Sequence, residues 1–133
     1  MSFSLDLEMD SRADRDCVLG ILREMQFEVS EERDDRVRGN FPESNMFAVF
    51  KWVTDEGEMT PRTEGADFAQ GWRIGVRANF YYVMSNCDKC GHEMREFLSR
   101  LDGATDAYFL FSFQMEKIYS IKDRDGMRIV GEF

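Results

Sequence analysis

The sequence predicts an α+β protein, with an antiparallel or mixed sheet of about six to eight strands and two helices packed on one face. Three patterns carry this prediction. Apolar and polar side chains alternate over residues 72–84, as in a long strand that buries one face. Apolar residues recur at helical spacing over 13–25 and again over 87–101. Short turns join most of the other apolar segments, and short turns favour antiparallel neighbours.

The expected strands are segments in which apolar residues alternate with polar ones or run together between turn residues. They are 3–9, 27–29, 37–41, 46–53, 72–84, 107–115, 118–122 and 127–130. The Asp125-Gly126 pair between the last two predicts a hairpin turn. The expected order is therefore strand, helix, four strands, helix and three strands.

Capping residues place the ends of the two helices. Ser11, followed three residues later by Asp14, predicts the start of the first helix. Ser85 or Asn86 is expected to cap the second helix, and Gly103 to end it.

The chain has 133 residues, which favours a single domain spanning 1–133. The longest irregular segment is expected at 55–70, and long loops often carry function. Residues 1–20 have neither a basic start nor an apolar stretch, so we expect no signal peptide and a cytoplasmic location. No apolar run is long enough to span a membrane.

Charge is distributed unevenly along the chain. The net charge is −9, from 26 acidic and 17 basic residues. Residues 1–70 hold 17 acids and 8 bases, whereas 71–133 hold nine of each. Nucleic acids and anionic membranes require a basic surface, so we expect neither as a partner. The complementary partner is a basic protein, because opposite charges accelerate association. The competing interpretation is that the acidity only keeps the protein soluble.

Two acidic segments and one strand face supply the candidate contact residues. The first segment contributes Glu31, Glu32, Asp34 and Asp35, and the second contributes Asp55, Glu56, Glu58, Glu64 and Asp67. The polar face of the strand at 72–84 supplies a second candidate surface, made of Arg73, Arg77 and Tyr81.

The three cysteines allow more than one interpretation. An odd number of cysteines without an export signal predicts reduced thiols. Cys87 and Cys90 with His92 resemble half of a zinc site or a redox pair, and four zinc ligands are available only if Cys17 joins them. Helical spacing instead places both thiols of the pair on the stripe that faces the core. Core cysteines therefore compete with a zinc- or redox-linked regulatory domain.

The chain lacks the residue patterns of common enzymes. It contains no phosphate-binding glycine loop, no dinucleotide fingerprint and no nucleophile elbow. A catalytic pair of Cys90 and His92 is disfavoured, because residues two apart on a helix point in different directions. We therefore expect no catalysis, no cofactor and no bound metal. A small-molecule-binding domain or enzyme is a third interpretation, and it predicts a deep pocket lined by convergent polar groups.

The C-terminal part resembles immunity proteins of bacterial polymorphic and type VI secreted toxins. The resemblance rests on GWRIGVRANFYY at 71–82, FLFSF at 109–113, EKIY at 116–119 and the Asp-x-Asp-Gly turn that follows. It covers 71–133 and contains no contact motif that would assign a role to an individual residue. It implies a cytoplasmic, non-catalytic protein that binds a cognate toxin stoichiometrically and occludes its active site. The expected function is therefore immunity-type neutralisation of a basic toxin domain.

Overall fold

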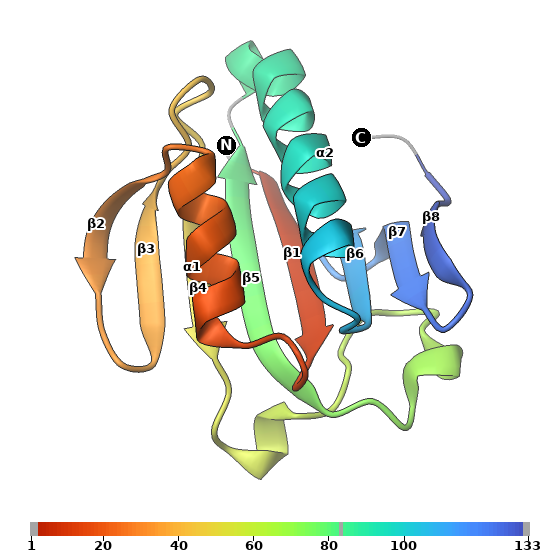
Figure 1. Ribbon diagram of the computed structural model, residues 1–133. Coiled ribbons are helices and arrows are strands. Elements are labelled where there is room, and N and C mark those ends of the chain that lie inside the picture. The colour runs from red at the N-terminus through yellow and green to blue at the C-terminus, as the bar shows by residue number, and fades with distance from the viewer. Residues whose placement is uncertain (1–2, 83, 132–133) are drawn as a thin grey trace.

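Eight strands form one antiparallel sheet, and two α-helices cover one of its faces (Figure 1). The computed structural model describes residues 3–82 and 84–131. The strands are β1 (Phe3–Asp10), β2 (Glu28–Glu32), β3 (Arg36–Asn40), β4 (Phe47–Trp52), β5 (Ile74–Tyr82), β6 (Phe109–Phe113), β7 (Lys117–Asp123) and β8 (Gly126–Ile129). The helices are α1 (Arg15–Glu24) and α2 (Cys87–Ala104). The predicted α+β fold and the predicted order of strands and helices are confirmed.

Strand β1 lies in the middle of the sheet, although it is the first element of the chain. The strand order is β2-β3-β4-β5-β1-β6-β7-β8, and every neighbouring pair is antiparallel. Strand β1 therefore joins two groups of consecutive strands, β2 to β5 on one side and β6 to β8 on the other. Its pairings are the long-range contacts that unite the two halves of the chain.

The main core lies between the sheet and the two helices. Phe50 of β4 and Phe80 of β5 meet edge to face with ring centroids 5.5 Å apart, and Phe97 of α2 lies 5.7 Å from Phe50. All three side chains are fully buried. Such aromatic pairs contribute about 0.5–1.5 kcal/mol each beyond the area that they bury. Within the described residues, neither helix is long and apolar enough to cross a membrane.

The helix ends differ slightly from the predicted positions. Asp14, rather than Ser11, is the N-cap of α1, and its Oδ1 accepts a hydrogen bond from a backbone N–H three residues on, at 2.7 Å. Helix α2 continues through Gly103 to Ala104 instead of ending at the glycine. Serine and aspartate are both good N-cap residues, so the sequence alone does not decide between Ser11 and Asp14. Helix ends are in general defined only to within one or two residues.

Strand β2 is longer than expected. Glu31 and Glu32 belong to the strand, and only residues 33–35 form the turn to β3. Glu31 lies opposite Arg38 and forms an ion pair with it at 2.6 Å. This cross-strand pair stabilises charged residues in an extended conformation.

The long connection between β4 and β5 crosses the sheet face opposite the helices. We expected that face to be exposed along β5, but residues 53–73 cover part of it. A second, smaller core forms there, with Ala66, Ala69, Leu110 and Ile121 as its buried members. Trp72, predicted as the first residue of the strand, packs partly against this core, and β5 begins two residues later.

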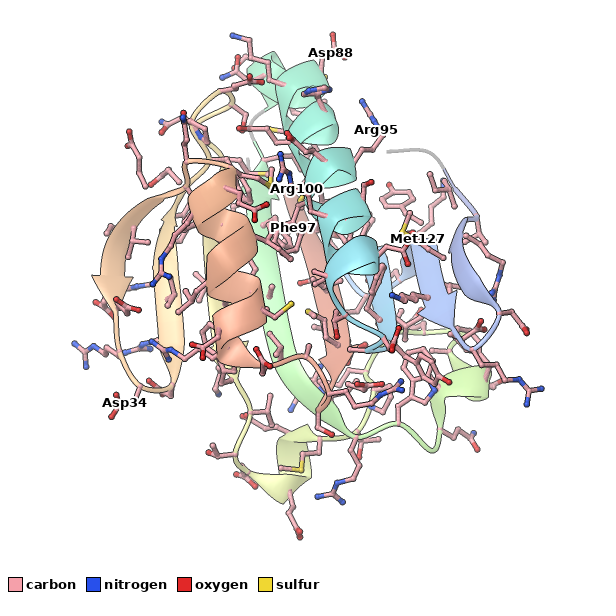
Figure 2. All side chains as sticks on the ribbon, in the orientation of Figure 1. Asp34, Asp88, Arg95, Phe97, Arg100 and Met127 are labelled. Atoms are coloured by element: carbon pink, nitrogen blue, oxygen red, sulfur yellow. The ribbon has the colours of Figure 1, made fainter. Side chains whose placement is uncertain are left out.

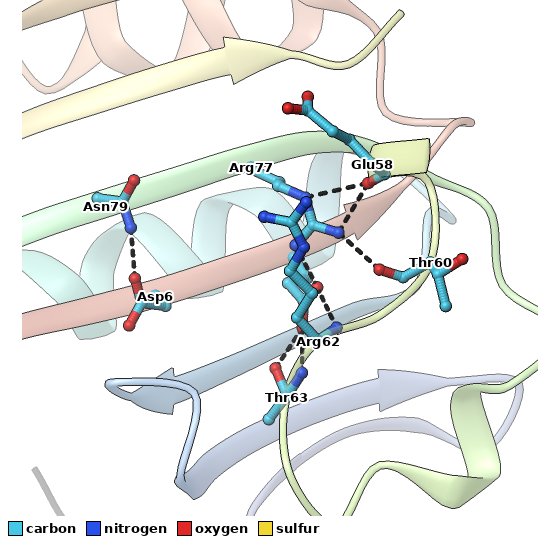
Figure 3. A network of polar contacts seen from close by, with 8 residues as sticks. Asp6, Glu58, Thr60, Arg62, Thr63, Arg77 and Asn79 are labelled. Carbon is cyan, nitrogen blue, oxygen red and sulfur yellow. Dashed lines mark hydrogen bonds and ion pairs between the residues drawn. The ribbon is translucent and has the colours of Figure 1, made fainter. Parts of the chain in front are cut away.

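A buried ion pair between Glu8 of β1 and Arg77 of β5 holds this connection on the sheet (Figure 3). The Glu8 carboxylate accepts hydrogen bonds from the backbone N–H groups of residues 62–63, at 2.8 and 2.9 Å. The Arg77 guanidinium donates to the carbonyl oxygens of Glu58, at 2.7 Å, and Thr60, at 2.6 Å. Both charges are thus balanced by each other and by loop backbone, which is what burial of charge requires.

Asp6 lies two residues before Glu8 on the same face of β1. Its carboxylate accepts a hydrogen bond from Asn79 (Figure 3). Burial raises the pKa of Asp6, and the hydrogen bond from Asn79 opposes that rise.

Two other buried carboxylates also bind the backbone of neighbouring loops. Glu93 of α2 accepts hydrogen bonds from the backbone N–H groups of residues 43–44, both at 3.0 Å. Asp10, at the end of β1, accepts one from Tyr108 at 2.9 Å and forms an ion pair with Arg12. Part of the acidic excess therefore lies in the interior and adds nothing to the surface that a partner would meet.

The Arg77→Ala variant tests the role of the buried pair. Removing the guanidinium leaves the Glu8 charge buried without its cation, so we expect a loss of about 3–5 kcal/mol in the free energy of unfolding. The matched control is Arg73→Ala, because Arg73 is exposed and lies 3.8 Å from Glu56, and it should cost no more than about 1 kcal/mol. Urea unfolding of both variants measures the difference, and equal losses would contradict the assigned role.

A pair of glycine substitutions tests the packing of β3. A Cβ at Gly39 would lie 2.1 Å from the carbonyl oxygen of Glu28 and 2.6 Å from the Phe27 ring, so Gly39→Ala should destabilise the fold by about 1–3 kcal/mol. Gly20 in α1 has nothing within 4 Å of such an atom, so Gly20→Ala should stabilise it by about 0.5–1 kcal/mol. Thermal unfolding should give shifts of opposite sign. A stabilised Gly39→Ala would show that β2 is free to move away.

Candidate interaction surface

Both predicted acidic segments reach the end of the sheet at which β1 finishes. The backbone N–H of Trp52 donates to the carbonyl oxygen of Asp35 at 2.8 Å, which joins the end of β4 to the β2–β3 turn. Arg15 of α1 donates to the carbonyl oxygen of Asp34 at 2.7 Å. Strand β6 begins there too, opposite the last residues of β1. Turns and helix termini from distant parts of the chain therefore lie at the same end of the sheet, at the bottom of Figure 1.

Six exposed carboxylates on this surface have no cationic group within 4.0 Å among residues 3–82 and 84–131. We call them the acidic end: Asp14, Asp16, Asp34, Asp35, Asp55 and Asp106. They extend from the turn before β3 to the connection before β6, four strand spacings or about 19 Å apart. All six are aspartates on turns or at helix starts. These six aspartates form a patch of unpaired negative charge at one end of the sheet. Other exposed carboxylates, such as Glu43, Asp88 and Glu116, also have no ion pair among the described residues and lie outside this patch.

The glutamates of the first acidic segment are largely neutralised. Three arginines surround Glu31: Arg33 at 3.1 Å, Arg36 at 3.4 Å and Arg38 at 2.6 Å. The hydrogen bond from Arg38 is the largest cause of a pKa of Glu31 below its usual value. Glu32 forms an ion pair with Arg15 at 3.3 Å. The unpaired charge of this segment therefore belongs to the two aspartates of the turn.

The second acidic segment divides between the two ends of the sheet. Asp55 and Glu56 lie at the acidic end, where Asp55 caps a short 3-10 helix. Glu58 is ion-paired with a lysine of β4 at 3.0 Å. The loop carries Glu64 to the opposite end, where its backbone N–H bonds to the β6–β7 turn, and Asp67 begins η2 (Asp67–Ala69) on the way back.

The proposed second surface on β5 is not continuous. Arg73 is exposed at the acidic end. Arg77 is buried beneath the loop and is not available to a partner, so its assignment as a contact residue is wrong. Tyr81 is 38% exposed, but it stacks on Phe47 toward the opposite end of the sheet. The alternation along β5 correctly placed Arg77 and Tyr81 on the face opposite the helices. It could not show that the loop between β4 and β5 covers this face at Arg77.

A groove beside the acidic end combines aromatic and charged residues. It has a volume of about 300 Å³ and is lined by Phe68, Trp72, Tyr108, Asp123, Arg124 and Asp125. We call it the aromatic groove. Phe68 is 47% exposed and packs edge to face on Trp72, whose ring lies 5.3 Å from that of Tyr108. Exposed aromatic residues beside charged ones are typical of protein-binding hot spots.

Sequence reasoning missed the aromatic groove because its residues come from three separate segments. Residues 68–72 belong to the loop, Tyr108 precedes β6, and 123–125 form the β7–β8 turn. The one local signal was Phe68, the only aromatic residue of the irregular segment at 55–70.

The groove contains a carboxylate whose titration can be tested directly. Arg128 donates to Asp123 at 2.8 and 2.9 Å and lowers the pKa of Asp123 to about 2. The stabilisation from this pair is therefore complete above the ordinary value of 3.8 and is lost as the pH falls toward 2. NMR titration should find a midpoint near 2 in the wild type and a clearly higher one in Arg128→Ala. Arg124→Ala should shift the midpoint of Asp123 less. An unchanged midpoint in Arg128→Ala would show that Arg128 is not the cause of the lowered pKa.

The cysteine motif lies at the opposite end of the molecule. The prediction that both thiols face the core is confirmed for Cys90, which is buried, and wrong for Cys87, which is exposed. Cys87 is the first residue of α2, at the margin of the core, and His92 is also exposed. In the described part of the chain, no three His, Cys, Asp or Glu side chains lie close enough to hold a metal ion. The zinc interpretation therefore gains no support there.

A small, partly open cavity bears on the small-molecule interpretation. It has a volume of about 200 Å³, lies beside the Glu8–Arg77 pair, and is also lined by Lys51 and Glu58. These four charged groups pair with each other, Lys51 with Glu58 at 3.0 Å. The volume is below the roughly 300 Å³ at which ligand pockets usually begin. The cavity therefore gives this interpretation little support.

No known protein family matches the chain, and no curated protein or solved structure is significantly similar to it.

Proposed function

We propose that this protein is an immunity-type inhibitor, which binds a basic toxin domain one to one through the acidic end and occludes the toxin's active site without catalysis. The observation that carries this proposal is the gathering of six unpaired, exposed aspartates at one end of the sheet. A second class of partner, nucleic acid, is disfavoured by the same charge. The proposed location is the cytoplasm, where such an inhibitor would protect the cell that makes it.

Electrostatics favours a protein partner of opposite sign. A protein of net charge −9 with six unpaired carboxylates on one surface attracts a cationic domain before contact and helps to orient it. The use of aspartate also favours tight binding. Its side chain has fewer rotatable bonds than that of glutamate, so less conformational entropy is lost when a partner fixes it.

The aromatic groove complements the acidic end. Charged residues at an interface mainly set the association rate and the specificity, whereas buried aromatic side chains supply most of the affinity. Phe68 and Trp72 are available for that role, because Phe68 is exposed and Trp72 is only partly buried. A toxin domain that contacts the acidic end can therefore place an apolar or basic side chain against these rings.

The first test asks whether a toxin exists. The products of the genes on either side of this protein's gene are expressed alone and together with it. We expect one of them to arrest growth alone, and co-expression to restore growth and give a one-to-one complex. If neither product is toxic and neither binds this protein, the proposed function is wrong.

The second test asks whether the acidic end makes the contact. In the Asp34→Asn/Asp35→Asn/Asp55→Asn variant, we expect the association rate with the toxin domain to fall by about tenfold or more, because the steering field is lost. The wild-type rate should fall steeply between about 0.05 M and about 0.5 M salt, and the variant's rate should fall less steeply. Stopped-flow fluorescence measures both.

Asp88→Asn is the matched control for this test. Asp88 is also exposed, but it lies at the opposite end of the molecule from Asp34 (Figure 2). Its substitution should leave the association rate unchanged within about twofold, because its distance from the acidic end exceeds the Debye length of about 8–10 Å. A wild-type rate that does not depend on salt would exclude the acidic end as the contact surface.

A further inference from the structure

The first turn of α2 carries two thiols in very different environments. Cys87 is exposed, whereas Cys90 is 1% exposed. Both line a small cavity of about 90 Å³ between the start of α2 and the sheet, together with Tyr82, Gly91 and Tyr119. One sulfur is thus open to solvent, and the other lies behind it in the same cavity. From this arrangement we propose that Cys87 and Cys90 are a redox-active dithiol, oxidised to an intramolecular disulfide by a small-molecule disulfide such as glutathione disulfide.

The spacing suits an intramolecular bond. Residues three apart on an α-helix are neighbours on one side, with Cβ atoms roughly 5–6 Å apart. A disulfide requires Cβ atoms roughly 3.5–4.5 Å apart, so the turn must tighten by about 1 Å. The 3-10 helix η3 (Met84–Asn86) leads directly into α2, and 3-10 geometry brings residues i and i+3 into line. That stacking alone leaves the two residues about 6 Å apart along the axis, so the bond requires Cys87, the first residue of α2, to shift toward Cys90, and helix ends are the part of a helix that frays most easily.

The helix terminus favours reaction at Cys87. The first N–H groups of a helix point toward its N-terminus and stabilise negative charge there, including that of a thiolate. Asn86 precedes the helix, but its side chain makes no capping bond and instead donates to the carbonyl oxygen of Ser44 at 3.1 Å. The first N–H groups of α2 therefore donate no hydrogen bond to the N-cap side chain, and Cys87 is the exposed residue beside them.

The proposed oxidation proceeds by two thiol–disulfide exchanges. The Cys87 thiolate attacks one sulfur of glutathione disulfide, forms a mixed disulfide and releases one glutathione thiolate. The Cys90 thiol then loses its proton, and its sulfur attacks the Cys87 sulfur. The new Cys87–Cys90 bond forms as the second glutathione thiolate leaves. In total, two protein thiols are oxidised and one glutathione disulfide is reduced to two glutathione molecules.

The third cysteine is a natural control. Cys17 lies on α1 with its Sγ 4.0 Å from the carbonyl oxygen of Ala104, at the far end of α2. The helix between residues 87 and 104 rises roughly 25 Å, so Cys17 cannot reach either thiol of the pair in the folded protein. Burial also raises the pKa of Cys17, which disfavours its reactive thiolate.

A purely structural role explains only half of the motif. A buried cysteine behaves as a small apolar residue, and that account is sufficient for Cys90. It does not explain Cys87, an exposed cysteine three residues earlier on the same helical turn. Because this motif lies at the opposite end from the acidic end, the dithiol is independent of the proposed inhibitory function.

The test is oxidation of the folded protein in glutathione buffers of graded composition, followed by alkylation of the remaining thiols and mass spectrometry. We expect the wild type to lose two hydrogens, to carry no glutathione, and to be alkylated only at Cys17. Cys90→Ser should instead accumulate a glutathione adduct at Cys87, because no second thiol displaces it. Cys87→Ser, which changes an exposed residue and should fold normally, should not react at the buried Cys90. Cys17→Ser should form the same internal disulfide as the wild type.

Three results would overturn the proposal. The first is a wild-type protein that keeps glutathione on Cys87 as Cys90→Ser does. The second is a wild-type protein in which Cys87 and Cys90 are both still alkylated after treatment with glutathione disulfide alone. The third is a disulfide that includes Cys17 under native conditions. Loss of toxin binding by the acidic-end variants would leave all of these outcomes unaffected.

Discussion

The ion pair of Glu8 and Arg77 is the contact on which the candidate surface depends. It lies between two central strands, where neither charge would be stable without full hydrogen bonding. The loop between β4 and β5 supplies that bonding through backbone N–H groups to Glu8 and carbonyl oxygens to Arg77. The loop and the ion pair therefore require each other. Since the loop also carries Asp55 and Phe68, this pair positions one aspartate of the acidic end and the exposed ring of the aromatic groove.

The carboxylates of this protein serve three distinct purposes, which total charge does not distinguish. Glu8, Asp10 and Glu93 are buried and bind loop backbone. Glu31 lies among arginines and stabilises the outer hairpin. The unpaired aspartates of the acidic end are left to interact with solvent or a partner. A surface argument from composition alone thus overestimates the negative charge of some segments, such as 31–32, and does not show which carboxylates are left unpaired.

The periodicity of the sequence predicted the strands and helices of this fold. Contacts between distant segments determine which charged residues are exposed and unpaired, and the sequence does not show those contacts. The alternation over 72–84 and the helical spacing over 87–101 are local patterns, and both gave the correct element because one side of each is buried. The covering of Arg77 depends on the path of an irregular loop, which has no period. The neutralisation of Glu31 depends on the register between β2 and β3, which places Arg38 opposite it. Cys87 was misplaced because a helical stripe does not show where the core ends.

The acidic end consists of turns and helix starts, and no strand interior contributes a carboxylate to it. Apart from Asp14 and Asp55, whose side chains cap helices, residues at such positions make few packing contacts, so their replacement has little effect on folding. The strands and the helix-covered core can thus stay the same while the proposed contact surface changes one aspartate at a time. A scaffold with this separation is suited to diversification: descendants of one gene can acquire different binding preferences without passing through unstable intermediates.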